Sequence, residues 1–92
     1  MDNEIVIQQI KDLHEECVKI NDIMFAELQE YNGHVCDIYN QFPGGFNCTP
    51  HDRLLIKNIL EQDKIDYNKT KRQHKNKIYR LKCKMIRLKH NI

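Results

Sequence analysis

Two histidines and two cysteines in the middle of the chain have the side-chain types that zinc prefers as ligands. They form the patterns His34-x-Cys36 and Cys48-x-x-His51. The eleven residues between the two patterns include one proline and two glycines, so a bend there would let the four ligands meet. Residues two apart on a helix, however, point about 200° away from each other, so the zinc hypothesis requires a helix that ends near Gly33. The alternative is that Cys36 and Cys48 pack around the loop and both histidines are exposed.

Asp63, His74 and Cys17 have the side-chain types of a catalytic triad, but their spacing argues against one. On a single helix Asp63 and His74 would stand about 16 Å apart, too far to share a hydrogen bond. The sequence also has no glycine-rich phosphate-binding loop. We therefore expect a non-enzymatic protein with no cofactor and no small-molecule substrate. In it, His74 would face Cys17 in a polar layer that fixes the register of two helices.

Length and composition favour a small helical protein. The chain has 92 residues, of which 30% are charged and 8% are aromatic, and it has no tryptophan. This composition is ordinary for long helices, and a core of this size is marginal without a partner. The sequence has no run of about 18 apolar residues and no signal peptide. We expect an intracellular protein, cytoplasmic or nuclear, that does not enter the membrane and keeps its four cysteines reduced.

Apolar residues in the first half of the chain recur at steps of three and four. This heptad pattern, with one stutter near Met24, predicts a helix over about residues 3–41. Gly33 is the weak point of that helix, because a glycine in a helix interior costs about 1 kcal/mol relative to alanine. The seam residues are Val6, Ile10, Leu13, Cys17, Ile20, Met24, Leu28, Tyr31, Val35 and Ile38.

The second half begins with a clear helix start. Thr49 is a good N-cap and Pro50 suits the first helical position. Asp52 adds a negative charge in the first turn. These signals predict a turn over residues 42–49 and a helix over about residues 50–90. Its seam consists of Ile56, Leu60, Asp63, Tyr67, Lys71, His74, Ile78, Leu81, Met85 and Leu88.

The two seams predict an all-α fold, an antiparallel hairpin of two long helices with a coiled-coil-like contact, forming one domain over residues 1–92. If the chain folds back at Gly44 and Gly45, the numbers of facing residues total about 91. This register pairs Val35 with Ile56, Tyr31 with Leu60, Met24 with Tyr67, Leu13 with Ile78, Ile10 with Leu81, and Val6 with Met85. It also places Leu28 opposite Asp63, Ile20 opposite Lys71, and Cys17 opposite His74.

The apolar surface of the first helix is therefore wider than one partner helix can bury. A second stripe on a neighbouring face contains Ile7, Val18, Phe25 and Cys36. Both features predict that another chain completes the hairpin into a helical bundle, as a homodimer or with different helical subunits. We expect a scaffold or adaptor subunit of a multiprotein complex. Its predicted partner-binding residues are Ile7, Val18, Ile20, Met24, Phe25 and Leu28.

Charge is divided between the two halves of the chain. Residues 2–37 contain nine acids and two lysines, whereas the chain after Asp66 has no acid and ten lysines and arginines. Our first interpretation is a solvated face that is matched to an acidic partner subunit. The alternative is a polyanion-binding module that contacts nucleic-acid phosphates, although the sequence has no known reader motif. The residues for that alternative are Lys75, Lys77, Arg80, Lys82, Lys84 and Arg87.

Overall fold

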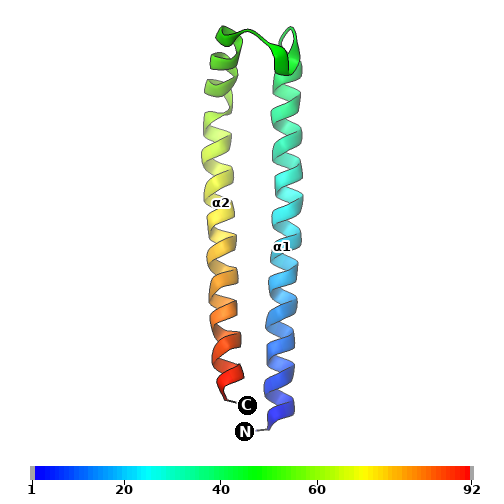
Figure 1. Cartoon of the computed structure of the whole chain (residues 1–92), viewed down its shortest axis with the longest axis vertical. Helices are drawn as coiled ribbons and strands as arrows, with labels where there is room; N and C mark the ends of the chain where they lie inside the picture. The colour runs from blue at the N-terminus through cyan, green and yellow to red at the C-terminus, as the bar shows by residue number, and fades with distance from the viewer. Residues whose placement is uncertain (1, 92) are drawn as a thin grey trace. The chain divides into compact units, whose positions relative to one another are not determined.

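The protein is an antiparallel hairpin of two long α-helices, as the computed structural model shows for residues 2–91 (Figure 1). Helix α1 spans Asn3–Asn40, a short 3-10 helix η1 spans Gly45–Asn47, and helix α2 spans Pro50–His90. The described residues contain no β-strand. The all-α helical hairpin predicted from the two heptad seams is thus confirmed.

Side-chain caps fix where both helices begin. The backbone N–H of Glu4 donates to Asp2 Oδ1 over 2.9 Å at the start of α1. The backbone N–H of Asp52 donates to Thr49 Oγ1 over 3.2 Å at the start of α2. Each oxygen satisfies a backbone donor that the helix itself leaves unpaired, which stabilises a helix by about 0.5–2 kcal/mol.

Helix α1 continues without a break through Gly33. Apart from its chain neighbours and the adjoining backbone of α1, no described atom lies within 4 Å of the place where a Cβ of Gly33 would stand, so the residue faces open space. The helix ends instead before two glycines with positive φ, Gly44 at 85° and Gly45 at 53°. Glycine adopts this left-handed conformation without steric cost, and the chain can therefore reverse there.

The chain divides into two compact units, each with a core of its own. We call Met1–Phe25 with Lys71–Ile92 the terminal unit, and Ala26–Thr70 the turn unit. In each unit a stretch of α1 packs antiparallel to a stretch of α2, and the turn unit also contains η1.

The core of the terminal unit is made of heptad residues from both helices. Cys17 and Ile20 of α1 are buried with Leu81 and Met85 of α2. Four partly buried residues pack against this cluster: Ile10, Leu13, Met24 and Ile78. Val6 is fully buried nearer the start of α1.

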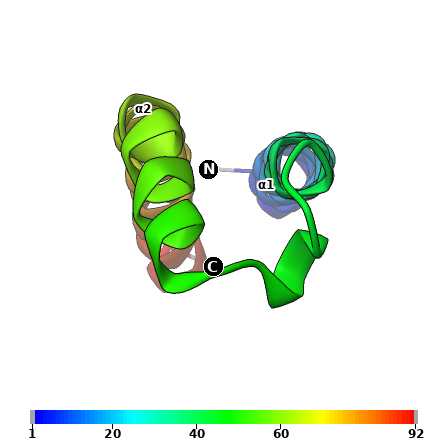
Figure 2. The ribbon, with the colours of Figure 1, turned by 90° about the horizontal axis from the view of Figure 1, so that it is seen from above.

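The core of the turn unit joins the loop to the first turns of α2. Cys48, Ile56 and Leu60 are buried together, and Val35, Ile38, Tyr39 and Phe42 pack against them. The loop is fixed to α2 by Arg53, whose Nη2 donates to the carbonyl oxygen of Phe46 over 3.1 Å. The ring of Phe46 in turn stacks on Tyr39 at a centroid distance of 4.8 Å. Seen from above, η1 lies in the connection between the end of α1 and the start of α2 (Figure 2).

The predicted helix register is wrong by about one heptad. In the turn unit, Tyr31 stacks on Tyr67 with ring centroids 4.5 Å apart, and His34 Nε2 lies 2.9 Å from Asp63 Oδ2. The two residue numbers total 98 in the first pair and 97 in the second, instead of 91. The expected pairings of Tyr31 with Leu60 and of Leu28 with Asp63 are therefore replaced.

The terminal unit differs from the prediction in the same direction. A total of 91 would place His74 opposite Cys17 and Lys71 opposite Ile20. The structure instead buries both α1 residues with Leu81 and Met85, further along α2. Cys17 thus belongs to an apolar cluster, and the predicted polar layer with His74 is corrected. The physical reason is that residues 41–49 fold against α2, which moves the mirror point of the hairpin from the glycines towards Thr49.

Candidate interaction surface

The six residues predicted to bind a partner fall into two groups. Ile20 is buried in the core of the terminal unit, and Met24 is half-buried against that core, so both serve the hairpin's own packing. The other four are exposed: Ile7 at 42%, Val18 at 44%, Phe25 at 61% and Leu28 at 39%. The partner surface must therefore be defined without Ile20 and Met24.

Ile7, Val18 and Phe25 form one apolar stripe on α1, which we call the α1 stripe. Each directly follows a core-facing residue: Val6, Cys17 or Met24. One residue corresponds to about 100° around a helix, so the stripe lies beside the face that packs on α2. It remains uncovered along the terminal unit.

The basic residues predicted on α2 are all exposed. Lys71–Ile92 contains nine lysines and arginines and no acid. An ion pair joins His34 to Asp63 in the turn unit, and within residues 2–91 none is shown between these nine cations and a carboxylate. The positive charge of this segment is left for solvent or for a binding partner.

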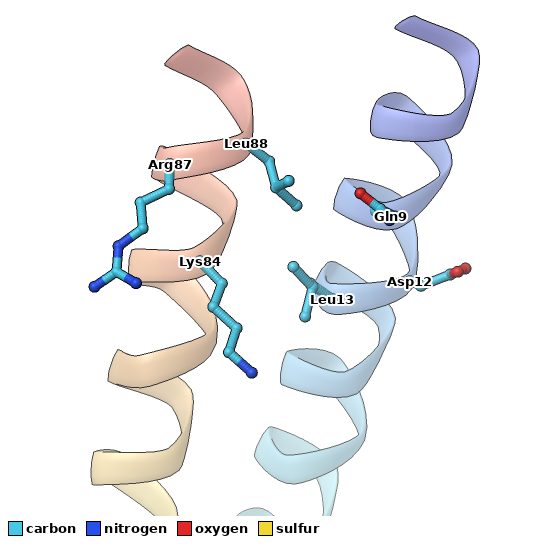
Figure 3. Close-up of a pocket in the computed structure, with 6 residues that line it drawn as sticks. All are labelled: Gln9, Asp12, Leu13, Lys84, Arg87 and Leu88. Atoms are coloured by element: carbon cyan, nitrogen blue, oxygen red, sulfur yellow. The ribbon is translucent and has the colours of Figure 1, made fainter. Parts of the chain in front are cut away.

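Two of these cations border a shallow pocket of about 450 Å³ in the terminal unit. Figure 3 shows Leu13 and Leu88 pointing towards each other across this pocket, with Lys84 extending towards α1. Arg87 and Asp12 point away from the gap, on opposite helices. The local acid, Asp12, therefore does not neutralise Lys84 or Arg87, and no ion pair within residues 2–91 is shown for either base.

Two apolar residues interrupt the basic surface of α2. Tyr79 is 70% exposed and Ile86 is 54% exposed, and they stand seven residues apart on one face. Lys75 and Lys82 flank them at steps of four and three. This face combines positive charge with an aromatic ring, a combination that suits stacking on unpaired bases as well as contact with phosphates.

The turn unit contains a larger groove, of about 620 Å³, which the sequence did not reveal. Its apolar lining comes from both helices: Tyr31, Val35, Tyr39, Ile56, Leu60 and Ile65. Its polar and charged lining comes from α2 alone: Arg53, Lys57, Glu61, Lys64 and Asn68. With three cations and one carboxylate, the charged edge is positive.

The four candidate zinc ligands do not come together. Because α1 is continuous past Gly33, His34 and Cys36 point to different sides of it. Cys48 is buried in the core of the turn unit, and His51 is exposed in the first turn of α2. Among the described residues, no group of three or more histidine, cysteine or acidic side chains could hold a metal ion.

The three residues with triad chemistry are also separated. Asp63 contacts His34, and Cys17 is buried in the apolar core of the terminal unit. His74 is half-buried on α2, eleven residues beyond Asp63. Apart from these separated residues, the structure has three exposed surfaces: the α1 stripe, the basic face of α2 and the turn-unit groove.

No helix within residues 2–91 combines the length and apolar character needed to cross a membrane. Comparisons with protein-family models, curated proteins and solved structures gave no match.

Proposed function

We propose that this hairpin is a non-enzymatic interaction subunit that packs against the helices of another chain to complete a helical bundle. The observation that carries the proposal is the α1 stripe, where Ile7, Val18 and Phe25 are exposed on a single face. The role would be that of a scaffold or adaptor within a multiprotein assembly.

The energetic argument concerns the water-exposed area of these side chains. Fully burying one Val, Ile or Phe side chain contributes about 1.5–3 kcal/mol. Single exposed apolar residues are ordinary, whereas a larger exposed apolar patch marks an interaction site, and the row of three on α1 is our candidate for one. A helix from another chain would cover the row by ordinary helix packing.

The test is to replace two residues of the stripe by acids, in the variant Val18→Asp with Phe25→Asp. The tagged 92-residue chain is expressed in its native cells, and the size of its assembly is measured by gel filtration with light scattering. Wild type should elute in a particle larger than the 11.1 kDa chain, and the variant should elute as the free chain. A wild type that is always the free chain, or a variant that keeps the assembly, contradicts the proposal.

The matched control uses the other flank of the same helix. Ile5 and Ile23 are exposed as well, at 57% and 48%, and each directly precedes a core-facing residue. The variant Ile5→Asp with Ile23→Asp therefore makes the same chemical change outside the stripe. It should keep the assembly, which separates loss of the interface from a general effect of added acids on α1.

A second candidate function is polyanion binding through the basic segment of α2. It is favoured by the nine unpaired cations of Lys71–Ile92 and by exposed Tyr79. Binding of a fluorescent single-stranded oligonucleotide should weaken with salt, with a slope of about −4 in a double-logarithmic plot if six phosphates are neutralised. Salt-insensitive binding, or no binding at low salt, would exclude this candidate.

A further inference from the structure

We infer that the partner of this hairpin is a second copy of the same chain, whose α1 stripe lies in the turn-unit groove. The inference rests on the proposed function and gives it a specific occupant. It joins the terminal unit of one molecule to the turn unit of another.

The groove has the shape and lining that an amphipathic helix requires. Its floor contains the buried residues Ile56 and Leu60 and the half-buried Val35. Tyr31 and Tyr39 line it from α1. Helices dock into such grooves by inserting apolar anchors at heptad-related positions. Val18 and Phe25 of the α1 stripe are seven residues apart and would serve as two successive anchors.

The charges beside the groove match the charges beside the stripe in spacing and in sign. Lys57 and Lys64 at the groove are seven residues apart, and so are Glu15 and Asp22 beside the stripe. Each pair thus spans about 10.5 Å along its helix. All four side chains are exposed, and none has an ion pair within the part of the chain that the structure describes.

The acids stand where docking would bring them to the edge of the groove. Glu15 precedes Val18 by three residues, and Asp22 precedes Phe25 by three residues. Residues three apart on a helix are neighbours on its surface. When the apolar anchors enter the groove, both carboxylates therefore reach its edge, as the flanking charges of a coiled coil do.

Of the two helical segments in the terminal unit, the one from α1 is the segment whose charge fits. Residues 1–25 have six acids and two lysines, a side-chain charge of −4, whereas Lys71–Ile92 has nine bases and no acid. A second copy that offered its α2 segment would bring lysines against Lys57 and Lys64. Like charges in contact are unfavourable, so the groove selects α1.

The two units also attract each other between molecules. The terminal unit has eleven lysines and arginines and six acids, a side-chain charge of +5. The turn unit has four lysines and arginines and seven acids, a side-chain charge of −3. Contacts between like units of two copies are therefore repulsive at long range, and contacts between unlike units are attractive.

Charge reversal on the purified 92-residue chain tests the inference. The groove variant is Lys57→Glu with Lys64→Glu, and the stripe variant is Glu15→Lys with Asp22→Lys. Molar mass is measured by light scattering over a range of protein concentrations, after circular dichroism has shown wild-type helicity. Wild type should have a multiple of 11.1 kDa, and each variant alone should dissociate with a dissociation constant raised about tenfold or more.

The decisive arm is an equal mixture of the two variants. In a mixed pair the reversed groove meets the reversed stripe, and the native stripe meets the native groove, so both contacts regain opposite charges. Mixing should therefore restore wild-type mass. The matched control is Lys75→Glu with Lys82→Glu, a reversal of two lysines seven residues apart on the same helix but outside the groove. It lowers the charge of the terminal unit from +5 to +1 and so weakens the long-range attraction, but it should dissociate the chain far less than the groove variant does.

Three results would overturn the inference: a monomeric wild type, variants that keep wild-type mass, or a mixture that stays dissociated. If charge reversal unfolds the chain, the neutral substitutions Lys57→Gln with Lys64→Gln take its place, and unchanged mass again counts against the groove. The purified chain could be monomeric and still join an assembly in its native cells that depends on the α1 stripe. That result would contradict the second-copy inference but leave the proposed function intact. An assembly that survives Val18→Asp with Phe25→Asp would instead remove the proposed function.

Discussion

Gly33 is the residue at which sequence and structure differ most in what they suggest. Its position inside a heptad pattern predicted a weak point in the helix. In the structure α1 continues through Gly33, and the place of its missing side chain faces open space. The glycine therefore adds backbone freedom to the unfolded chain without serving any contact that the described residues show.

The substitution Gly33→Ala should stabilise the hairpin by about 0.5–1 kcal/mol, because alanine restricts the unfolded chain and is the better helix former. For a domain of this size, 1 kcal/mol corresponds to a rise in Tm of about 4–8 °C. Thermal unfolding followed by circular dichroism measures the shift. An unchanged or lower Tm would contradict the conclusion that an alanine side chain is accommodated at this position without strain.

Gly44 provides the opposite case and serves as the control. Its φ is 85°, and a Cβ there would stand 3.2 Å from the carbonyl oxygen of Asn47. The variant Gly44→Ala should therefore lose about 1–2 kcal/mol, since the left-handed conformation is strained for any residue with a side chain. A Tm that rose in both variants would contradict this assignment of the turn.

At the scale of the helices, the sequence could predict the fold but not the register. Caps and heptad steps are local signals, and they correctly indicated two helices that pack antiparallel. If one helix slides past the other by seven residues, every seam position stays on the same face. The apolar pattern therefore hardly distinguishes two registers that differ by one heptad. The register is instead set by the loop of residues 41–49. This loop packs against α2 through Cys48 and a hydrogen bond from Arg53, and a heptad pattern does not describe such packing.

The predicted mismatches could not settle the register. A total of 91 set Cys17 against His74 and Ile20 against Lys71, whereas the observed core of the terminal unit buries Cys17 and Ile20 with Leu81 and Met85. A total of 98 removes those two mismatches but sets Val35 against Asp63. The apolar pattern alone therefore does not distinguish the two registers.

The register can be checked without any substitution. The rings of Tyr31 and Tyr67 are nearly parallel, at an angle of 7° and a centroid distance of 4.5 Å. Nuclear Overhauser effects between the two rings are therefore expected in solution, together with ring-current shifts of their protons. Contacts from the Tyr31 ring to the Leu60 methyl groups, with none to Tyr67, would support the register of 91 instead.

At the scale of the whole molecule, the uneven distribution of charge matters more than the net charge. A total of +2 conceals a terminal unit of +5 and a turn unit of −3. Ionic strength should therefore act strongly on association. Raising the salt from about 0.1 M to 1 M shortens the Debye length from about 10 Å to 3 Å, and light scattering should then report more free chain.

The four cysteines are distributed evenly between the two units. The terminal unit contains buried Cys17 and half-buried Cys83, and the turn unit contains buried Cys48 and half-buried Cys36. All four are free thiols. Each core thus holds one thiol that a reagent reaches only when that core opens, and each unit holds a second thiol that is partly accessible without opening.

The chain consequently has a native reporter of opening in each core. Mass spectrometry during labelling with a thiol reagent should show Cys36 and Cys83 reacting early and Cys17 and Cys48 reacting late. The variant Ile56→Ala leaves a cavity in the turn-unit core, which typically costs about 2–5 kcal/mol. It should accelerate labelling of Cys48 far more than labelling of Cys17, and equal acceleration would mean that both cores open in one step. Labelling times on the unaltered chain would thus read the stability of its two cores separately, a measurement that usually requires engineered probes.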